Sequence, residues 1–164
     1  VVASNSSDDS RLCAMSTKNP IRLFVTHAFA SNSDYHRVFE YLEASPNFFY
    51  LNCSVPDYPP ATGSKEALKD EYRAQIKNAE VVVVLSSLYL ENEYWTTYQM
   101  DVAQANNLPL VAMEVFGVST KVPLEITKRC AEVIGWNERT MIDTLRRQAR
   151  HEDVKRWETI EFKL

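Results

Sequence analysis

The residues of this sequence that could take part in chemistry are aromatic and polar side chains in three short stretches, at 26–29, 54–58 and 86–99. Planar rings around a polar opening suit a nucleobase or a nicotinamide ring, because such a ligand can stack on them and hydrogen bond at its edge. Packing against the core is the more common role of aromatic residues near a sheet edge. The candidates are His27, Phe29, Tyr58, Tyr89, Tyr94, Trp95 and Tyr98.

Several common catalytic motifs are missing from the sequence. Three glycines are too few for a G-x-G-x-x-G or G-x-x-x-x-G-K-[ST] phosphate loop, and no G-x-S-x-G hydrolase elbow occurs. A response regulator would need an aspartate where Ser86 and Ser87 stand. His27, His36 and His151 are too scattered for a metal site, so we expect no metal.

The charge balance argues against a nucleic-acid partner. The formal net charge is -4 at pH 7, whereas nucleic-acid binders carry clustered Lys and Arg. One basic group, Arg146, Arg147 and Arg150, fits the solvated end of a helix, and an anion site is the alternative. Because no run approaches the ~18 apolar residues that cross a bilayer, we expect no membrane partner either.

The cysteines and the first residues bear on the compartment. Cys13, Cys53 and Cys130 lack metal-ligand spacing and cannot all pair, which is typical of a reducing compartment. The first ten residues, VVASNSSDDS, are polar and acidic, unlike a signal peptide. We therefore expect a cytoplasmic protein.

Alternating apolar patterns predict one α/β domain over residues 21–150. Strands are expected at 21–27, 48–52, 81–87, 108–116 and 131–136, and helices at 34–44, 64–78, 92–106 and 137–150, with a helical turn at 123–128. Residues 1–20 are polar and indicate a flexible arm. Residues 151–164 carry Val154, Trp157 and Ile160 at helical spacing, which indicates a helical extension.

This order of elements predicts a three-layer, flavodoxin-like fold. Strands that alternate with helices form a doubly wound parallel sheet, here of about five strands in the order 2-1-3-4-5. Ligands bind such sheets outside the carboxyl ends of the strands, near the switch point between strands 1 and 3. The cleft is then surrounded by 26–31, 52–64, 86–95 and 114–121.

Four stretches spread over residues 21–147 resemble the bacterial TIR-like domains, the group that includes the TIR proteins of Thoeris anti-phage defence. IRLFVTHAFASNSDYHRVFEYLEASPNFFYLNCSVPDYPP is similar to the family's F-[IV]-[ST]-H opening and its later SVP segment. VVVVLSSLYLENEYWTTYQMDVA resembles the element that ends in W-x-x-[YC]-E. NNLPLVAMEVFG and VPLEITKRCAEVIGWNERTMIDTLR are similar to the closing elements, and the order agrees throughout.

The resemblance implies cleavage of NAD+, which is then a substrate and not a cofactor. Family members break the nicotinamide–ribose bond and release nicotinamide with an ADP-ribose-type signal, linear or cyclic, for a downstream effector. Departure of neutral nicotinamide builds positive charge on C1′, which a fixed carboxylate stabilises. In the family this carboxylate is the glutamate of W-x-x-[YC]-E.

The sequence departs from the family at that residue, because Trp95-Thr96-Thr97-Tyr98 is followed by Gln99. An amide keeps the shape of the carboxylate and loses its charge, so cleavage is expected to be impaired. The chain is then a natural pseudoenzyme or an engineered Glu→Gln variant, and a lone departure in an intact motif favours the second. Asp101 lies about 200° further around the helix, at ~3.6 residues per turn, and cannot substitute.

The remaining substrate-binding positions implied by the resemblance are Thr26, His27, Ala28, Phe29, Ser54, Tyr58, Ser86, Ser87, Trp95 and Tyr98. Packing and turn formation are the alternatives for several of them. The function predicted first is a TIR-type NAD+ glycohydrolase or cyclase of antiviral signalling, impaired at Gln99 and able to self-associate. A catalytically silent TIR-type interaction module and a nucleotide-sensing flavodoxin-like domain are the alternatives.

Overall fold

The structure is a computed structural model that describes residues 15–118 and 121–151. Five parallel strands form one sheet in the order β2-β1-β3-β4-β5, as the sequence predicts. They are β1 (Ile21–Val25), β2 (Tyr50–Asn52), β3 (Val81–Leu85), β4 (Leu110–Met113) and β5 (Glu132–Ile134). Because all are parallel, their carboxyl ends share one edge of the sheet.

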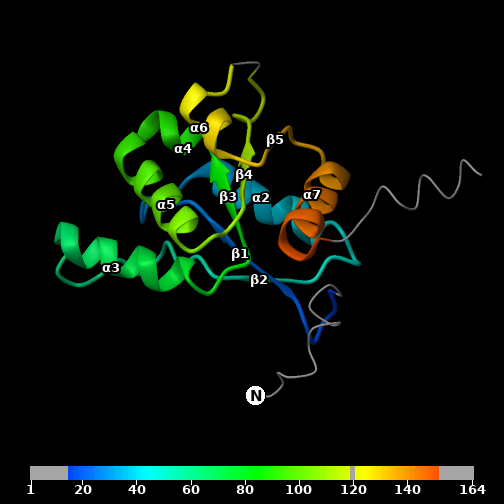
Figure 1. Cartoon of the computed structure of the whole chain (residues 1–164), viewed down its shortest axis with the longest axis horizontal. Helices are drawn as coiled ribbons and strands as arrows, with labels where there is room; N and C mark the ends of the chain where they lie inside the picture. The colour runs from blue at the N-terminus through cyan, green and yellow to red at the C-terminus, as the bar shows by residue number, and fades with distance from the viewer. Residues whose placement is uncertain (1–14, 119–120, 152–164) are drawn as a thin grey trace, which may run out of the picture.

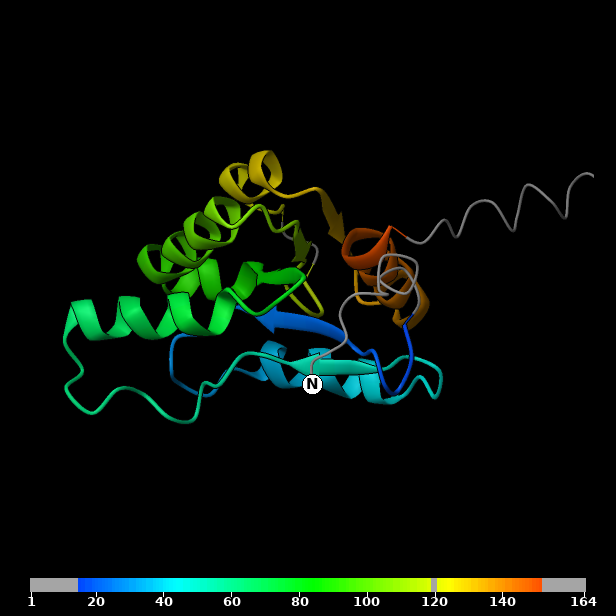
Figure 2. The same cartoon turned by 60° about the horizontal axis from the view of Figure 1, so that its bottom comes forward.

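Helices cover both faces of this sheet and make the three predicted layers (Figures 1 and 2). The helices are α2 (Ser33–Glu43), α3 (Lys65–Ile76), α4 (Ser86–Glu91), α5 (Glu93–Ala105), α6 (Leu124–Arg129) and α7 (Glu138–Arg150). Ser64 and Asn137, where two of the predicted helices begin, are N-caps that accept hydrogen bonds from the backbone N–H groups of Ala67 and Thr140. The flavodoxin-like α/β prediction is confirmed.

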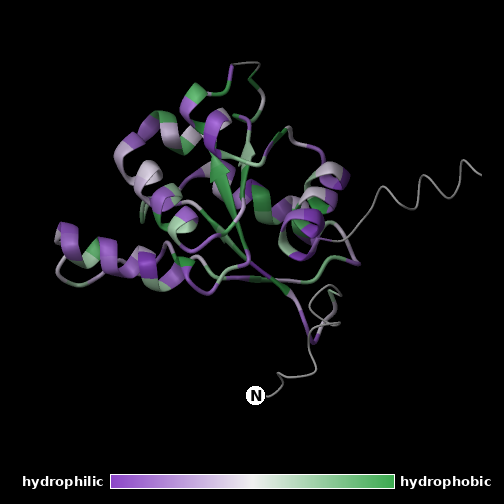
Figure 3. Ribbon diagram, viewed as in Figure 1, coloured by the Kyte–Doolittle hydropathy of each residue, from purple (hydrophilic) through white to green (hydrophobic). Residues whose placement is uncertain are grey.

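Two apolar clusters hold the layers together. One packs α2 and α7 on one face of the sheet, and the other packs α3, α5 and α6 on the opposite face. The continuous apolar run of β3 is buried on both faces, as expected for a central parallel strand. Figure 3 shows hydrophobic strands at the centre and hydrophilic residues on the outward faces of the helices.

The predicted strands 21–27 and 81–87 are too long, because both strands end before their polar residues. The Thr26 hydroxyl oxygen accepts the backbone N–H of Leu85 (3.1 Å), which replaces a backbone bond between β1 and β3. Beyond this point Ser86 and Ser87 begin α4, a helix that the sequence did not predict. The strands expected at 48–52, 108–116 and 131–136 are also shorter than predicted.

The basic group near the end of α7 corrects another expectation. Arg150 is 3% exposed and pairs with Glu80, and Arg147 pairs with Glu132 (2.7 Å), so these side chains are not merely solvated. Arg150 also donates to the carbonyl of Pro20 (2.9 Å). These side chains join α7 to the amino ends of the strands. Their carboxylate and carbonyl partners account for the basic group without a bound anion.

The terminal segments are only partly covered by the structure. Met15 packs against the core and Ser16 bridges to Asn19, so residues 15–20 of the expected flexible arm are packed. Residues 1–14 and most of the predicted extension 151–164, with Val154, Trp157 and Ile160, lie outside the described residues. Within the described ranges, no helix is long and apolar enough to span a membrane.

Candidate functional site at the strand ends

Gln99 is fully buried on α5 and reaches the chain just after β1. Its Oε1 accepts the backbone N–H of His27 (3.0 Å), and its Nε2 donates to the carbonyl oxygens of His27 and Trp95 (2.9 Å each). The carboxamide thus uses its acceptor and both donors on backbone groups. It joins α5 to the end of β1, where the sequence places the site.

The His27 side chain is also buried, and its hydrogen bonds fix the imidazole tautomer. Nδ1 accepts the N–H of Phe29 (3.2 Å), so in the neutral ring Nε2 carries the proton, which it donates to Gln75 Oε1 (2.9 Å). Burial lowers the pKa of His27 to about 4, against smaller opposing effects of Gln75, Glu71 and Asp57. The ring is neutral at pH 7, so it offers no positive charge to a phosphate.

Aromatic rings gather around Tyr72 on α3, which is not one of the predicted site residues. The Tyr72 hydroxyl donates to the His27 carbonyl (2.7 Å). The ring centroids of His27 and Phe29 lie 5.1 Å from that of Tyr72, and the centroid of Trp95 lies 5.4 Å away. The predicted residues His27, Phe29 and Trp95 are therefore brought together by the buried Tyr72.

Phe29 has a left-handed backbone conformation with φ of 54°. A non-glycine residue rarely adopts this region without support from its surroundings. The support here is the hydrogen bond to His27 Nδ1 and the edge-on contact with the His27 ring, with centroids 4.6 Å apart. Ala28 is half-buried and packs against the cluster under α2 and α7.

Ser86 and Ser87 stand at the start of α4, at the end of the central strand β3. Both hydroxyl oxygens are buried, and neither has a hydrogen-bond partner among the described residues. Buried polar groups without partners are uncommon in folded proteins and call for a specific explanation. These hydroxyls are candidates for contact with a ligand.

Two predicted residues from the loop after β2 have different surroundings. The Ser54 side chain is buried, and its hydroxyl lies 2.7 Å from the Tyr35 hydroxyl and also donates to Asn52. Tyr58 is 76% exposed, and the structure does not bring its ring into the cluster around Tyr72 within the described part of the chain. The loop thus begins inside the site region and carries Tyr58 into solvent.

Tyr98 lies at the edge of the rings around Tyr72, with its centroid 6.4 Å from that of Tyr72, and lines a hollow of about 630 Å³ between α3 and α5. Its hydroxyl accepts from Arg73 (2.6 Å), and the Lys69 ammonium lies 5.5 Å from its ring centroid. Asp101 lines the same hollow and pairs with Arg129 (2.6 Å). The nearest carboxylate along the helix is therefore held outside the site, as the helical geometry predicts.

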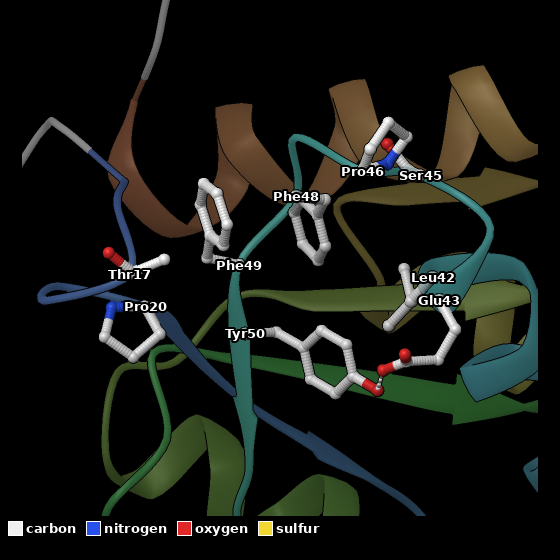
Figure 4. Close-up of a pocket in the computed structure, with 9 residues that line it drawn as sticks. All are labelled: Thr17, Pro20, Leu42, Glu43, Ser45, Pro46, Phe48, Phe49 and Tyr50. Atoms are coloured by element: carbon white, nitrogen blue, oxygen red, sulfur yellow. Dashed lines mark hydrogen bonds between the residues drawn. The ribbon is translucent and has the colours of Figure 1, made fainter.

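A second hollow lies at the opposite, amino ends of the strands (Figure 4). The Tyr50 hydroxyl there donates to Glu43 (2.5 Å), and the rings of Phe48 and Tyr50 stack with centroids 6.0 Å apart. Its lining residues are Thr17, Pro20, Leu42, Glu43, Ser45, Pro46, Phe48, Phe49 and Tyr50. This hollow has no part in the strand-end site.

The described residues offer no group of three or more His, Cys, Asp or Glu side chains that could hold a metal ion.

Gly135, Trp136 and Asn137 have structural roles. Trp136 Nε1 donates to the Glu114 carbonyl (2.7 Å), and Asn137 caps α7. Neutral polar groups and aromatic rings make up the contacts around Gln99, and they suit binding of a planar, hydroxylated ligand.

Residues 24–120, more than half of the chain, match the family described as Thoeris protein ThsB, TIR-like domain. The chain belongs to this family. The match contains the end of β1 and all of β3 and α5, and so includes His27, Ser86 and Gln99. The resemblance inferred from the four sequence stretches is confirmed, and it makes this chain a TIR-type domain related to defence.

One solved structure of similar fold is a 2-deoxyribosyltransferase from the psychrotolerant bacterium Bacillus psychrosaccharolyticus. It superposes with a TM-score of 0.52 and 10% sequence identity, over 82% of this ThsB-family chain and 93% of that chain. At this identity the similarity shows the fold alone. A search of curated protein sequences gives no match.

Proposed function

We propose that this chain is a TIR-type domain of bacterial antiviral defence that binds NAD+ at the carboxyl ends of β1 and β3 and is blocked at the cleavage step. The observation that carries the proposal is the buried Gln99, whose carboxamide contacts His27 and Trp95 at the strand ends. Family membership supports NAD+ as the ligand class, and the neutral amide supports the block.

The block has an electrostatic cause. When the nicotinamide–ribose bond breaks, positive charge develops on C1′, and a carboxylate stabilises it in a site that excludes water. An amide offers only a dipole, and both of its N–H donors are already bonded to carbonyl oxygens. Loss of one preorganised group costs about 10²–10³ in rate in comparable sites, and we expect at least that loss relative to a family member with glutamate.

Binding can persist without that charge. Ser86 and Ser87 carry hydroxyl groups that lack partners within the described residues and can bond to ribose or phosphate oxygens. Phe29 and Trp95 contribute rings beside Tyr72 against which a planar group can pack. In a form with a carboxylate at 99, the ADP-ribose-type product would be the soluble signal for an effector.

The test compares the chain with its Gln99→Glu form. Calorimetry measures NAD+ binding, and chromatography measures release of nicotinamide, each with and without conditions that promote assembly. We expect the unchanged chain to bind NAD+ without release, and Gln99→Glu to release nicotinamide. Gln104→Glu is the matched control, because it adds the same charge further along α5 beside Arg129. A chain that does not bind NAD+ in either form contradicts the proposal.

A silent interaction module is the second candidate, and exposed apolar side chains favour it. Segments that follow β2, β3 and β4 carry exposed Tyr58 (76%), Leu90 (61%) and Val118 (52%). Large apolar side chains in solvent at one end of a fold are typical of protein interfaces. Sedimentation of the chain and of a Leu90→Ser, Val118→Ser form tests this role, which predicts that the substitutions reduce association and leave NAD+ binding unchanged.

A further inference from the structure

Gln75, near the end of α3, connects two segments that are distant in the sequence. Its Oε1 accepts hydrogen bonds from His27 Nε2 (2.9 Å) and from the backbone N–H of Val55 (2.9 Å). Its Nε2 donates to the Val55 carbonyl (3.4 Å) and to Glu71 (3.0 Å). One buried carboxamide therefore joins the end of β1 to the start of the loop after β2.

These contacts fix the orientation of the amide and, through it, the state of the imidazole. The Val55 N–H requires an oxygen at the inner position of the Gln75 side chain, because a donor needs an acceptor. That oxygen in turn requires a protonated Nε2 on His27, which leaves Nδ1 free to accept the Phe29 N–H. The left-handed backbone of Phe29 thus depends on the amide two hydrogen bonds away.

We propose that Gln75 is a positioning residue of the strand-end site, which sets the His27 tautomer and so couples the loop after β2 to the backbone at Phe29. The loop after β2 and the segment after β1 then behave as one hydrogen-bonded unit. The consequence for ligand binding rests on the proposed function, since Phe29 and the loop are expected to contact NAD+.

The charged surroundings of His27 decide how this unit responds to pH. Glu71 on α3 and Asp57 in the loop after β2 favour the protonated ring, and burial opposes it more strongly. The other titratable groups packed against the ring are the phenols of Tyr72 and Tyr35, on α3 and α2. Because burial dominates and lowers the pKa of His27 to about 4, the ring is neutral throughout the physiological range, and its hydrogen bonds then set the tautomer.

Two substitutions at Gln75 separate positioning from simple packing. Gln75→Leu keeps the bulk and removes the acceptor of the Nε2 proton, so the Phe29 N–H alone is left to favour this tautomer of His27. Gln75→Glu keeps the acceptor, and once it loses its proton beside Glu71 and the Val55 carbonyl it adds a charge next to Nε2. That charge favours the imidazolium and raises the pKa of His27. Protonated Nδ1 can no longer accept the Phe29 N–H.

The experiment uses nitrogen NMR of the His27 ring from pH 4 to pH 8, without ligand, and calorimetry with NAD+ over the folded range. In the unchanged chain we expect a protonated Nε2 and an unprotonated Nδ1 down to about pH 5, with affinity independent of pH. Gln75→Leu should give a mixture of tautomers and weaken NAD+ binding about tenfold, the effect of one net hydrogen bond. Gln75→Glu should make binding weaken as pH falls through the raised pKa of His27.

Gln148→Leu is the matched control, since this amide donates to Glu132 on the far side of the sheet. It should change neither the His27 spectrum nor the affinity. An unchanged tautomer in Gln75→Leu overturns the proposal, as does pH-independent binding by Gln75→Glu after its His27 pKa has risen. If no form binds NAD+, the proposed function fails, and the ring spectra still decide the role of Gln75.

Discussion

The Gln99 side chain pairs with both backbone groups of His27, accepting its N–H at 3.0 Å and donating to its carbonyl at 2.9 Å. The amide therefore pairs with His27, two residues beyond the end of β1, as a neighbouring strand would. The same carbonyl also accepts from the Tyr72 hydroxyl. In this arrangement the contacts of position 99 suit an amide better than a carboxylate, because two of them are with carbonyl oxygens.

Gln99→Glu is accordingly expected to destabilise the fold at neutral pH by about 1–3 kcal/mol, the usual cost of unsatisfied buried groups. A carboxyl that faces carbonyl oxygens holds its proton more tightly when folded than when unfolded, so its pKa is raised. The stability of the variant is therefore retained below pH ~4.3, the unfolded value, and is lost as pH rises. Urea unfolding at several pH values measures the difference from the unchanged chain.

Gln104→Glu again provides the control, because Gln104 is exposed on the same helix and lies beside Arg129. Its stability should match that of the unchanged chain at every pH. Equal stability of Gln99→Glu and the unchanged chain at pH 7 would mean that the carboxylate rotates away from His27, and the argument from the two carbonyl contacts would be wrong.

The sheet could be predicted from the sequence because its signal is local. VVVV at 81–84 and the alternation of apolar runs with helical stripes specify parallel strands, and short connections specify their order. Strand ends were harder to predict, because Thr26 ends the β1–β3 ladder through a partner 59 residues away. The helix α4 was not predicted, because Ser86 and Ser87 directly follow the apolar run of β3 and were included in the predicted strand.

The candidate site was predicted in part. His27, Phe29, Trp95 and Gln99 come together as expected from their places after strands 1 and 3. Tyr72 and Gln75 were not predicted as site residues, because their positions on α3 fit the buried stripe of an ordinary amphipathic helix. Only the pairing of a buried amide with a histidine 48 residues away distinguishes them, and a single sequence does not show that pairing.

Ser86→Ala is expected to leave the free energy of unfolding unchanged or slightly higher. The hydroxyl is buried without a partner among the described residues, so its removal breaks no hydrogen bond and relieves a desolvation cost. If the hydroxyl contacts NAD+, affinity falls by roughly tenfold. Thermal unfolding and calorimetry on the same samples measure both quantities.

Ser64→Ala gives the opposite pattern and serves as the comparison. Ser64 caps α3 through the N–H of Ala67 (3.1 Å), so its loss should cost about 1 kcal/mol of stability and leave NAD+ affinity unchanged. If Ser86→Ala is clearly destabilised, the Ser86 hydroxyl of the unchanged chain has a partner within the protein. Ser86 would then not be a residue that binds the ligand.

Arg150→Met is expected to destabilise the chain by about 3–5 kcal/mol, because it leaves the Glu80 carboxylate largely buried without its main partner. It also removes the donor to the Pro20 carbonyl at the start of β1. Chemical unfolding measures the loss. Arg139→Met, at a side chain 90% exposed, should cost little, and Arg150→Met combined with Glu80→Gln should recover part of the loss.

The stability of the chain in acid depends on the buried His27 ring. The pKa of His27 is about 4 in the folded chain and near 6.5 when unfolded. As pH falls from about 6.5 the unfolded chain takes up the proton first, so this group removes stability, reaching roughly 2–3 kcal/mol near pH 4.5. The unfolding free energy of the unchanged chain should thus fall between pH 7 and pH 4.5 by that much more than that of His27→Gln.

The comparison uses slopes because His27→Gln also loses packing at every pH. His36→Gln on α2 is the control, an exposed histidine that does not share these buried contacts, and it should keep the slope of the unchanged chain. Equal slopes for the unchanged chain and His27→Gln would show that the His27 ring takes up its proton without unfolding. The ring would then be open to solvent in solution, and the Gln75–His27–Phe29 connection could not hold the strand-end backbone in place.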